Sequence, residues 1–166
     1  MRHVISVLVE NKFGVLAKVS GLFSGRGFNI DSLCVGETMD PTVSRMTIVV
    51  KGDDKILEQV TKQLNKLVDV IKVQDFTEVS YVDRELVLVK VEAPPKNRAQ
   101  ILEVAGIFRA KIVDVNPETV TLEVTGDQGK IKAIVGLLQP YGVRELVRTG
   151  RVAIARGAKA LKSLKE

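Results

Sequence analysis

The sequence predicts an α+β fold built from two βαββαβ units in tandem. Three observations support this class: strand-like and helix-like segments alternate, the alternation occurs twice, and the two halves share similar segments. The length of 166 residues suits two small domains. A single cysteine and a single histidine exclude a disulfide framework and a zinc site with the usual four ligands.

The first half contains the predicted elements of one complete unit. Residues 4–9 are rich in β-branched side chains, which predicts a strand. Apolar residues at helical spacing predict a helix over residues 15–23 that ends near Gly25. Strand, strand, helix and strand are then expected at residues 28–39, 43–51, 54–67 and 68–76.

The second half repeats this order. A strand is predicted at residues 86–92, a helix at 99–108, a hairpin at 111–125, a helix at 127–139 and a strand after Gly142. The tail is predicted to continue as a strand at residues 152–155, followed by a short basic helix at 158–165 or a frayed end. Val-Ser-Gly-Leu-Phe at residues 19–23 matches Val-Ala-Gly-Ile-Phe at 104–108, which indicates duplication. We predict domains at residues 1–78 and 79–166.

Each unit should form a ferredoxin-like domain, an antiparallel sheet with two helices on one face. Residues 4–9 and 86–91 are apolar at nearly every position, which predicts strands buried on both faces. The chain does not obviously supply a cover for the second face. We therefore expect a homodimer that pairs edge to edge or face to face.

Charge and hydropathy narrow the function classes. The net charge is +5, with −1 in residues 1–83 and +6 in residues 84–166, so the basicity belongs mainly to the C-terminal tail. No apolar run is long enough to span a membrane, and the N-terminus has no signal-peptide core. We expect a cytoplasmic protein without membrane association.

The first strand-to-helix turn is the leading candidate site. A helix that begins after Gly14 offers backbone N–H groups and a positive dipole end to a carboxylate, and Asn11 can present an amide oxygen to an ammonium group. Ordinary turn chemistry also explains both residues and is the simpler interpretation of this segment taken alone. Asn29, unusual in a strand, is either a structural asparagine or a ligand contact, with Ile30, Leu33 and Val35 as an aliphatic wall.

The chain resembles the small regulatory subunit of acetolactate synthase (acetohydroxyacid synthase), a family of ACT-domain amino-acid sensors. The matching segments include residues 11–16, Arg26-Gly27-Phe28-Asn29-Ile30, Ser44-Arg45-Met46-Thr47-Ile48, residues 63–70, 84–90 and 107–115. The Asn-x-x-Gly turn is common to ACT domains, whereas the combination of Ser-Arg-Met-Thr with Lys-Leu-Val-Asp-Val at residues 66–70 is particular to this family. Phe13 departs from the proline that often precedes the glycine.

The resemblance implies a non-catalytic regulatory subunit with no catalytic or metal-ligating residues. It implies that valine or another branched-chain amino acid binds where two ACT domains meet, and that a catalytic large subunit carries thiamine diphosphate, Mg²⁺ and FAD. The implied effector-binding residues are Asn11, Gly14, Val15 and Leu16 from one protomer, with Asn29, Ile30 and the nearby strand including Val35.

Two other classes remain as alternatives. An RNA-binding βαββαβ module would need aromatic side chains on the central strands, and residues 43–51 and 120–125 contain none. A small ferredoxin-like enzyme would need a cluster of histidines, paired carboxylates or a phosphate loop, none of which the sequence displays. We therefore expect no nucleic-acid partner.

Overall fold

The computed structural model describes residues 1–161, and two compact units make up the chain. The first comprises Met1–Val82 together with the chain from Arg151 onward, and the second comprises Asp83–Gly150. The sequence analysis assigned the whole tail to the second domain, whereas the structure places the tail's described part with the first unit. Among the described residues, no helix has the length and apolarity needed to cross a membrane.

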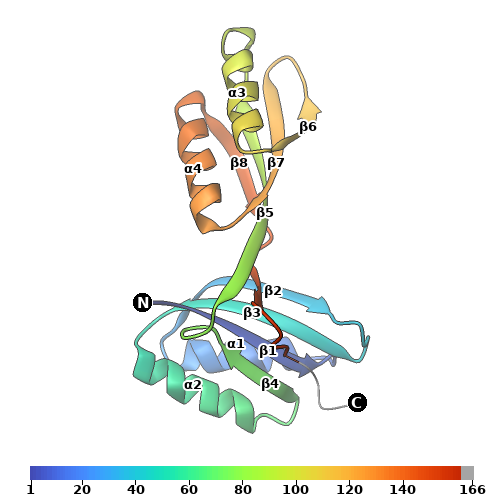
Figure 1. Ribbon diagram of the computed structural model, residues 1–166, viewed down its shortest axis with the longest axis vertical. Helices are drawn as coiled ribbons and strands as arrows, with labels where there is room; N and C mark the ends of the chain where they lie inside the picture. The colour runs from blue at the N-terminus through green and yellow to red at the C-terminus, as the bar shows by residue number, and fades with distance from the viewer. Residues whose placement is uncertain (162–166) are drawn as a thin grey trace. The chain divides into compact units, whose positions relative to one another are not determined.

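The first unit has the predicted βαββαβ order, with α1 and α2 on one face of its sheet (Figure 1). The sheet is antiparallel, in the strand order β2-β3-β1-β4. Its elements are β1 (Arg2–Glu10), α1 (Val15–Gly25), β2 (Asn29–Glu37), β3 (Val43–Lys51), α2 (Asp54–Lys66) and β4 (Val70–Asp75). The core under the helices contains Ile5, Val7, Phe23, Ile48 and Leu64.

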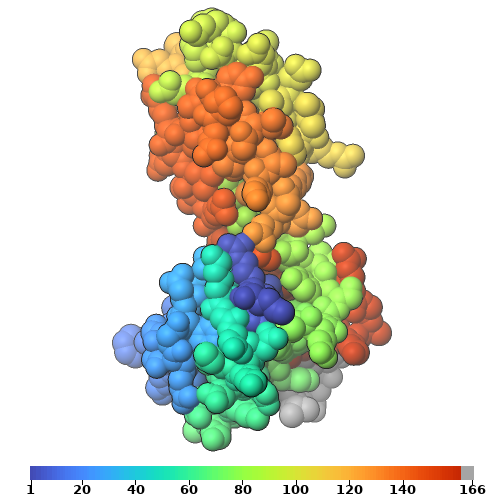
Figure 2. Space-filling model, turned by 90° about the vertical axis from the view of Figure 1, so that its left-hand side faces the viewer, coloured from blue at the N-terminus to red at the C-terminus, as the bar shows by residue number. Residues whose placement is uncertain are grey.

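The other face of this sheet is covered by the chain itself. Val4 and Val49 pack with Phe76 and with Ala153 of β9 (Val152–Ala155). Figure 2 shows the C-terminal residues, in red, beside the green segment near residue 80, where Arg156 N donates to Ser80 O at 2.9 Å. The expectation that the chain supplies no second cover is therefore wrong for this unit. We call residues 151–156 the C-terminal strap.

The second unit repeats the order on a sheet β6-β7-β5-β8, and β9 also pairs with β5. Its elements are β5 (Tyr81–Glu92), α3 (Pro95–Ile107), β6 (Lys111–Val115), β7 (Thr119–Gly126), α4 (Gln128–Leu138), the 3₁₀ turn η1 (Gln139–Tyr141) and β8 (Val143–Arg148). Helix α3 begins four residues before its predicted start because Pro95 occupies the first helical turn, where a missing N–H costs nothing. The α+β class of two ferredoxin-like domains is confirmed.

Two predictions about burial and the tail have different outcomes. Strand β1 is buried on both faces from His3 to Val9, as predicted, but β5 alternates and its Leu88 side chain is 37% exposed. The two strands differ because the C-terminal strap lies against the second face of the first sheet, the sheet that contains β1. Residues 158–161 are not helical, and the rest of the predicted basic helix lies outside the described residues.

Candidate functional site

Asn11 links the turn after β1 to the β2–β3 connection. Its backbone N–H donates to Thr42 O at 2.8 Å, and its side-chain Nδ2 donates to Pro41 O at 3.0 Å. A longer contact of 3.5 Å runs from Nδ2 to Glu37 Oε1. Because the chain holds the NH₂ group in place, the amide oxygen is the atom that can accept a hydrogen bond from a ligand.

Gly14 precedes an open helix start. Its φ of +80° lies in the left-handed region, and no side chain caps α1. By contrast, the carboxylates of Asp53 and Asp127 cap α2 and α4, accepting from Lys55 N and Lys130 N. The first N–H groups of α1, together with its dipole, are therefore suited to an anionic group such as a carboxylate.

A hollow of about 430 Å³ lies beside this turn, lined by Glu10, Asn11, Lys12, Pro41, Thr42 and Val43. Lys12 Nζ lies 2.6 Å from Glu10 Oε2, and this hydrogen-bonded carboxylate raises the pKa of Lys12. The sequence analysis left Pro41 and Thr42 in the connection between the predicted strands at residues 28–39 and 43–51. Their place at the site arises from the β2–β3 connection, whose position relative to Asn11 depends on strand register.

The predicted apolar residues divide into core and surface. Val15 is buried in the core, and its backbone N–H makes a long hydrogen bond of 3.5 Å to Lys12 O, so its side chain does not face a ligand. Leu16 and Val35 are 45% and 42% exposed, and the Phe13 side chain is fully exposed. Exposed apolar side chains beside an open helix start indicate a surface that another molecule covers.

Asn29 and Ile30 lie at the opposite end of β2 from the turn. Glu37, which contacts Asn11, is eight residues from Asn29, so about 25 Å separates the two groups at the usual strand rise. Asn29 Nδ2 donates to Asp31 Oδ1 at 3.2 Å, and Asp31 pairs with Arg2 at 3.1 Å. One chain therefore does not bring all the predicted effector-binding residues together.

The second unit fills the equivalent turn with its own side chain. Ala93 N donates to Glu118 O at 2.8 Å, in the way that Asn11 N donates to Thr42 O. Arg98 Nη2 donates to Ala93 O at 2.8 Å and its guanidinium also bonds Asn116 O. This turn is therefore closed by a guanidinium, where the first unit has a hollow.

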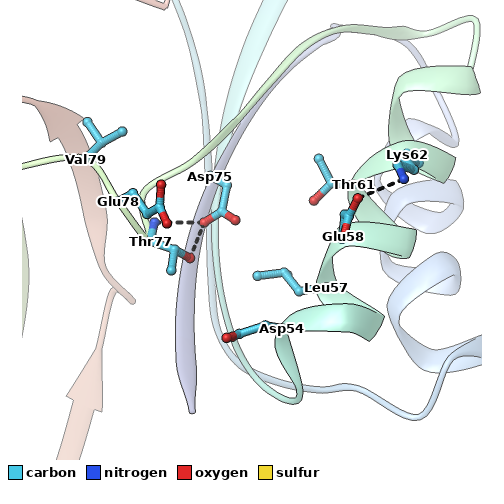
Figure 3. A pocket seen from close by; sticks show the side chains of 9 residues that line it. All are labelled: Asp54, Leu57, Glu58, Thr61, Lys62, Asp75, Thr77, Glu78 and Val79. Carbon is cyan, nitrogen blue, oxygen red and sulfur yellow. Dashed lines mark hydrogen bonds and ion pairs between the residues drawn. The ribbon is translucent and has the colours of Figure 1, made fainter.

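A second hollow, of about 570 Å³, lies between α2 and the segment after β4 (Figure 3). Its lining comprises Asp54, Leu57, Glu58, Thr61, Lys62, Asp75, Thr77, Glu78 and Val79. The chain's own groups engage three of its carboxylates: Asp54 contacts His3, Glu58 contacts Lys62, and Asp75 accepts from Thr77. The β1–β4 register places it at the other end of the sheet from Asn11.

The described part of the chain contains no group of three or more His, Cys, Asp or Glu residues arranged for a metal ion. Cys34 is partly buried on β2. The candidate polar sites of the first unit are thus the Asn11 turn, the Asn29–Asp31–Arg2 contacts and the contacts of the strap.

A βαββαβ domain with a glycine-started, uncapped helix beside an asparagine turn defines an ACT-type domain, here followed by a related second domain. Residues 5–72 match the family model for the AHAS small subunit-like ACT domain, and residues 84–157 match the model for the small subunit of acetolactate synthase. The chain belongs to the family of acetolactate synthase small subunits.

Relatives from distant organisms are similar in sequence to this chain over nearly its full length. A probable acetolactate synthase small subunit from Archaeoglobus fulgidus is 58% identical, covering 96% of this chain and 99% of that protein. The small subunit from Mycobacterium bovis is 50% identical over 98% of this chain and 97% of its own length. The crystal structure of the Thermotoga maritima small subunit is 45% identical, with a TM-score of 0.85 over 95% of this chain and 98% of that one.

Proposed function

We propose that this chain is a non-catalytic regulatory subunit that activates the catalytic large subunit of acetolactate synthase and makes it sensitive to feedback inhibition by valine. Thiamine diphosphate, Mg²⁺ and FAD then belong to the catalytic partner. The observation that carries the proposal is the uncapped start of α1 beside the fixed Asn11 amide. These groups complement the two charged ends of an amino acid.

The predicted homodimer completes the site through the β2 edge. Because the strap covers one face of the first sheet and the helices cover the other, the edge strands β2 and β4 are the surfaces left for pairing. We choose β2 because it carries Asn29 and, through Glu37, contacts Asn11. Antiparallel pairing of two β2 strands about their centre sets the partner's Asn29 opposite Glu37, which contacts Asn11. This arrangement unites the two groups that one chain keeps apart.

The chemistry of the joined site favours a small aliphatic amino acid. The N–H groups at the start of α1 bind the carboxylate, and the asparagine amide oxygens accept from the ammonium group. Leu16 and Val35 supply apolar walls for a branched side chain. A charged side chain would be buried without a partner against these walls, which costs several kcal/mol.

Inhibition follows if the bound and free dimers activate the catalytic subunit differently. A ligand that touches both protomers stabilises the dimer geometry in which both halves reach it. Feedback inhibition then requires that this geometry activate the catalytic subunit poorly.

Titration calorimetry with valine, leucine and isoleucine tests the effector, and reconstitution with the catalytic subunit tests activation. We expect saturable valine binding, higher acetolactate synthase activity with this chain present, and inhibition by valine only in the reconstituted enzyme. A melt at about 100 times the dissociation constant should show about 2.7 kcal/mol of stabilisation. An unchanged activity on adding the chain, or no binding of any of the three amino acids, contradicts the proposal.

A further inference from the structure

The C-terminal strap is attached to the same sheet that carries the candidate site. Arg45 on β3 donates from Nε to Ser6 Oγ and from Nη2 to Ala153 O, both at 2.8 Å. Arg151 N donates to Ser32 Oγ at 2.9 Å. Ser32 lies on β2, the strand that also carries Asn29, Ile30 and Val35.

Arg45 is an unusual anchor because it is a partly buried cation held by neutral oxygens. Its pKa is lowered by burial, with no carboxylate of the described residues opposing that effect. A desolvated guanidinium is costly unless its donors are satisfied. The hydroxyl of Ser6, on β1, satisfies Nε whether or not the strap is docked, whereas the Ala153 carbonyl satisfies Nη2 only while the strap is docked. Undocking the strap therefore removes this acceptor from the Arg45 guanidinium.

A β-bulge connects the strap to the effector residues. The register of β2 against β3 shifts between Ile30 and Ser32, so that Ile30 opposes Val50 and Ser32 opposes Val49. Val50 belongs to the core under the helices and Val49 to the cluster under the strap. The bulge at Asp31 thus turns Ile30 and Ser32, two residues apart on one strand, toward opposite faces of the sheet.

We propose that docking of the C-terminal strap is coupled to occupancy of the effector site, with Arg45 as the positioning residue and valine favouring the docked strap. This inference rests on the proposed function, since it concerns regulation of that same site. Coupling is reciprocal: if valine stabilises the docked strap, loosening the strap weakens valine binding by the same factor. Couplings of this kind are usually about 5–150-fold.

The test uses the full chain with three variants. Arg45→Ala removes the bond to Ala153 of the strap together with the bond to Ser6 within the sheet, Arg45→Lys keeps the charge without the two-pronged geometry, and Ser32→Ala removes the acceptor for Arg151 N. Arg98→Ala is the matched control because it also removes a guanidinium bonded to backbone carbonyls, but in the second unit. Valine affinity is measured by calorimetry, and amide exchange over residues 152–155 by mass spectrometry with and without valine.

We expect valine to slow exchange over residues 152–155 in the unmodified chain. Arg45→Ala should lower valine affinity by at least about fivefold, Arg45→Lys and Ser32→Ala should lower it less, and the Arg98→Ala control should not change it. Valine binding with unchanged exchange of the strap, or equal affinity in all three variants, overturns the coupling and leaves the proposed function intact. Absence of valine binding to the unmodified chain overturns the proposed function and the coupling with it.

Discussion

At the scale of single residues, the two asparagines have different environments. Both Nδ2 hydrogens of Asn11 point toward oxygens of the β2–β3 region, so its orientation is fixed by the fold. Asn29 is exposed and contacts only its near neighbour Asp31 among the described hydrogen bonds. A fold-only role therefore explains Asn11 better than it explains Asn29.

Replacing Asn29 with leucine should weaken valine binding by about 1–3 kcal/mol, because an amide that bonds the ligand is lost, while activation of the catalytic subunit persists. Calorimetry and reconstitution assays measure the two effects. Asn97→Leu, at a partly buried asparagine of α3, is the control. Unchanged valine affinity in Asn29→Leu would remove this residue from the site.

The cap residues make a second prediction at this scale. Asp53→Ala removes the carboxylate that accepts from Lys55 N at 2.7 Å and should lower the free energy of unfolding by about 1 kcal/mol. Urea denaturation without valine measures the change. Glu58→Ala on the same helix loses only a surface ion pair with Lys62 and should have a smaller effect. The reverse order would contradict the assigned cap.

At the scale of elements, β2 is the strand on which the proposed dimer depends. It is an edge strand with Val35 42% exposed, whereas its neighbour β3 is buried almost throughout. Val35→Lys should shift the chain from dimer to monomer in analytical ultracentrifugation, because a charge would be buried at the paired edge.

Val147→Lys provides the matched control for the dimer prediction. Val147 is 53% exposed on β8, which is the edge strand of the second sheet. We expect this variant to remain dimeric. Dissociation by Val147→Lys with a stable Val35→Lys dimer would move the interface to the second unit.

Sequence pattern predicted most of these elements but not what covers them. The bounds of β3 and β6 agree with the prediction because β-branched runs end at clear turn residues. The strap escaped the analysis because its contacts, such as Arg45 with Ala153, join residues 108 positions apart. Local periodicity carries no information about such a pairing, and the sequence analysis therefore left one sheet face uncovered.

At the scale of the whole molecule, the basic composition invites a test of nucleic-acid binding. The chain has seven aromatic residues, and Phe23, Phe28 and Phe76 are buried. Strands β1, β3 and β7 contain no Phe, Tyr or Trp, and the His3 ring of β1 is buried. Tyr81, at the start of β5, packs against Phe76. We predict no salt-sensitive RNA binding in a filter assay. Strong binding at low salt that falls as salt rises would revive the RNA-binding alternative.

The candidate site was only partly predictable from a single sequence. Asn11 and Gly14 could be found from the turn motif, and Asn29 from its odd place in a strand. The distance between the Asn11 turn and Asn29, which lie at opposite ends of β2, could not be predicted, because it depends on which strands pair. The contribution of Pro41 and Thr42 has the same origin, because the hollow beside Asn11 forms between two connections distant in sequence.

The two duplicated halves differ at the turn after their first strand, where the second unit carries Arg98. The turn of the first unit has a hollow beside Asn11, and in the second unit the Arg98 side chain bonds the carbonyls at the corresponding place. Under the proposed function, the second unit is therefore a copy of the amino-acid-binding domain whose turn is closed to a ligand. Design of a second amino-acid site in this chain should therefore begin with replacement of Arg98 by a shorter side chain.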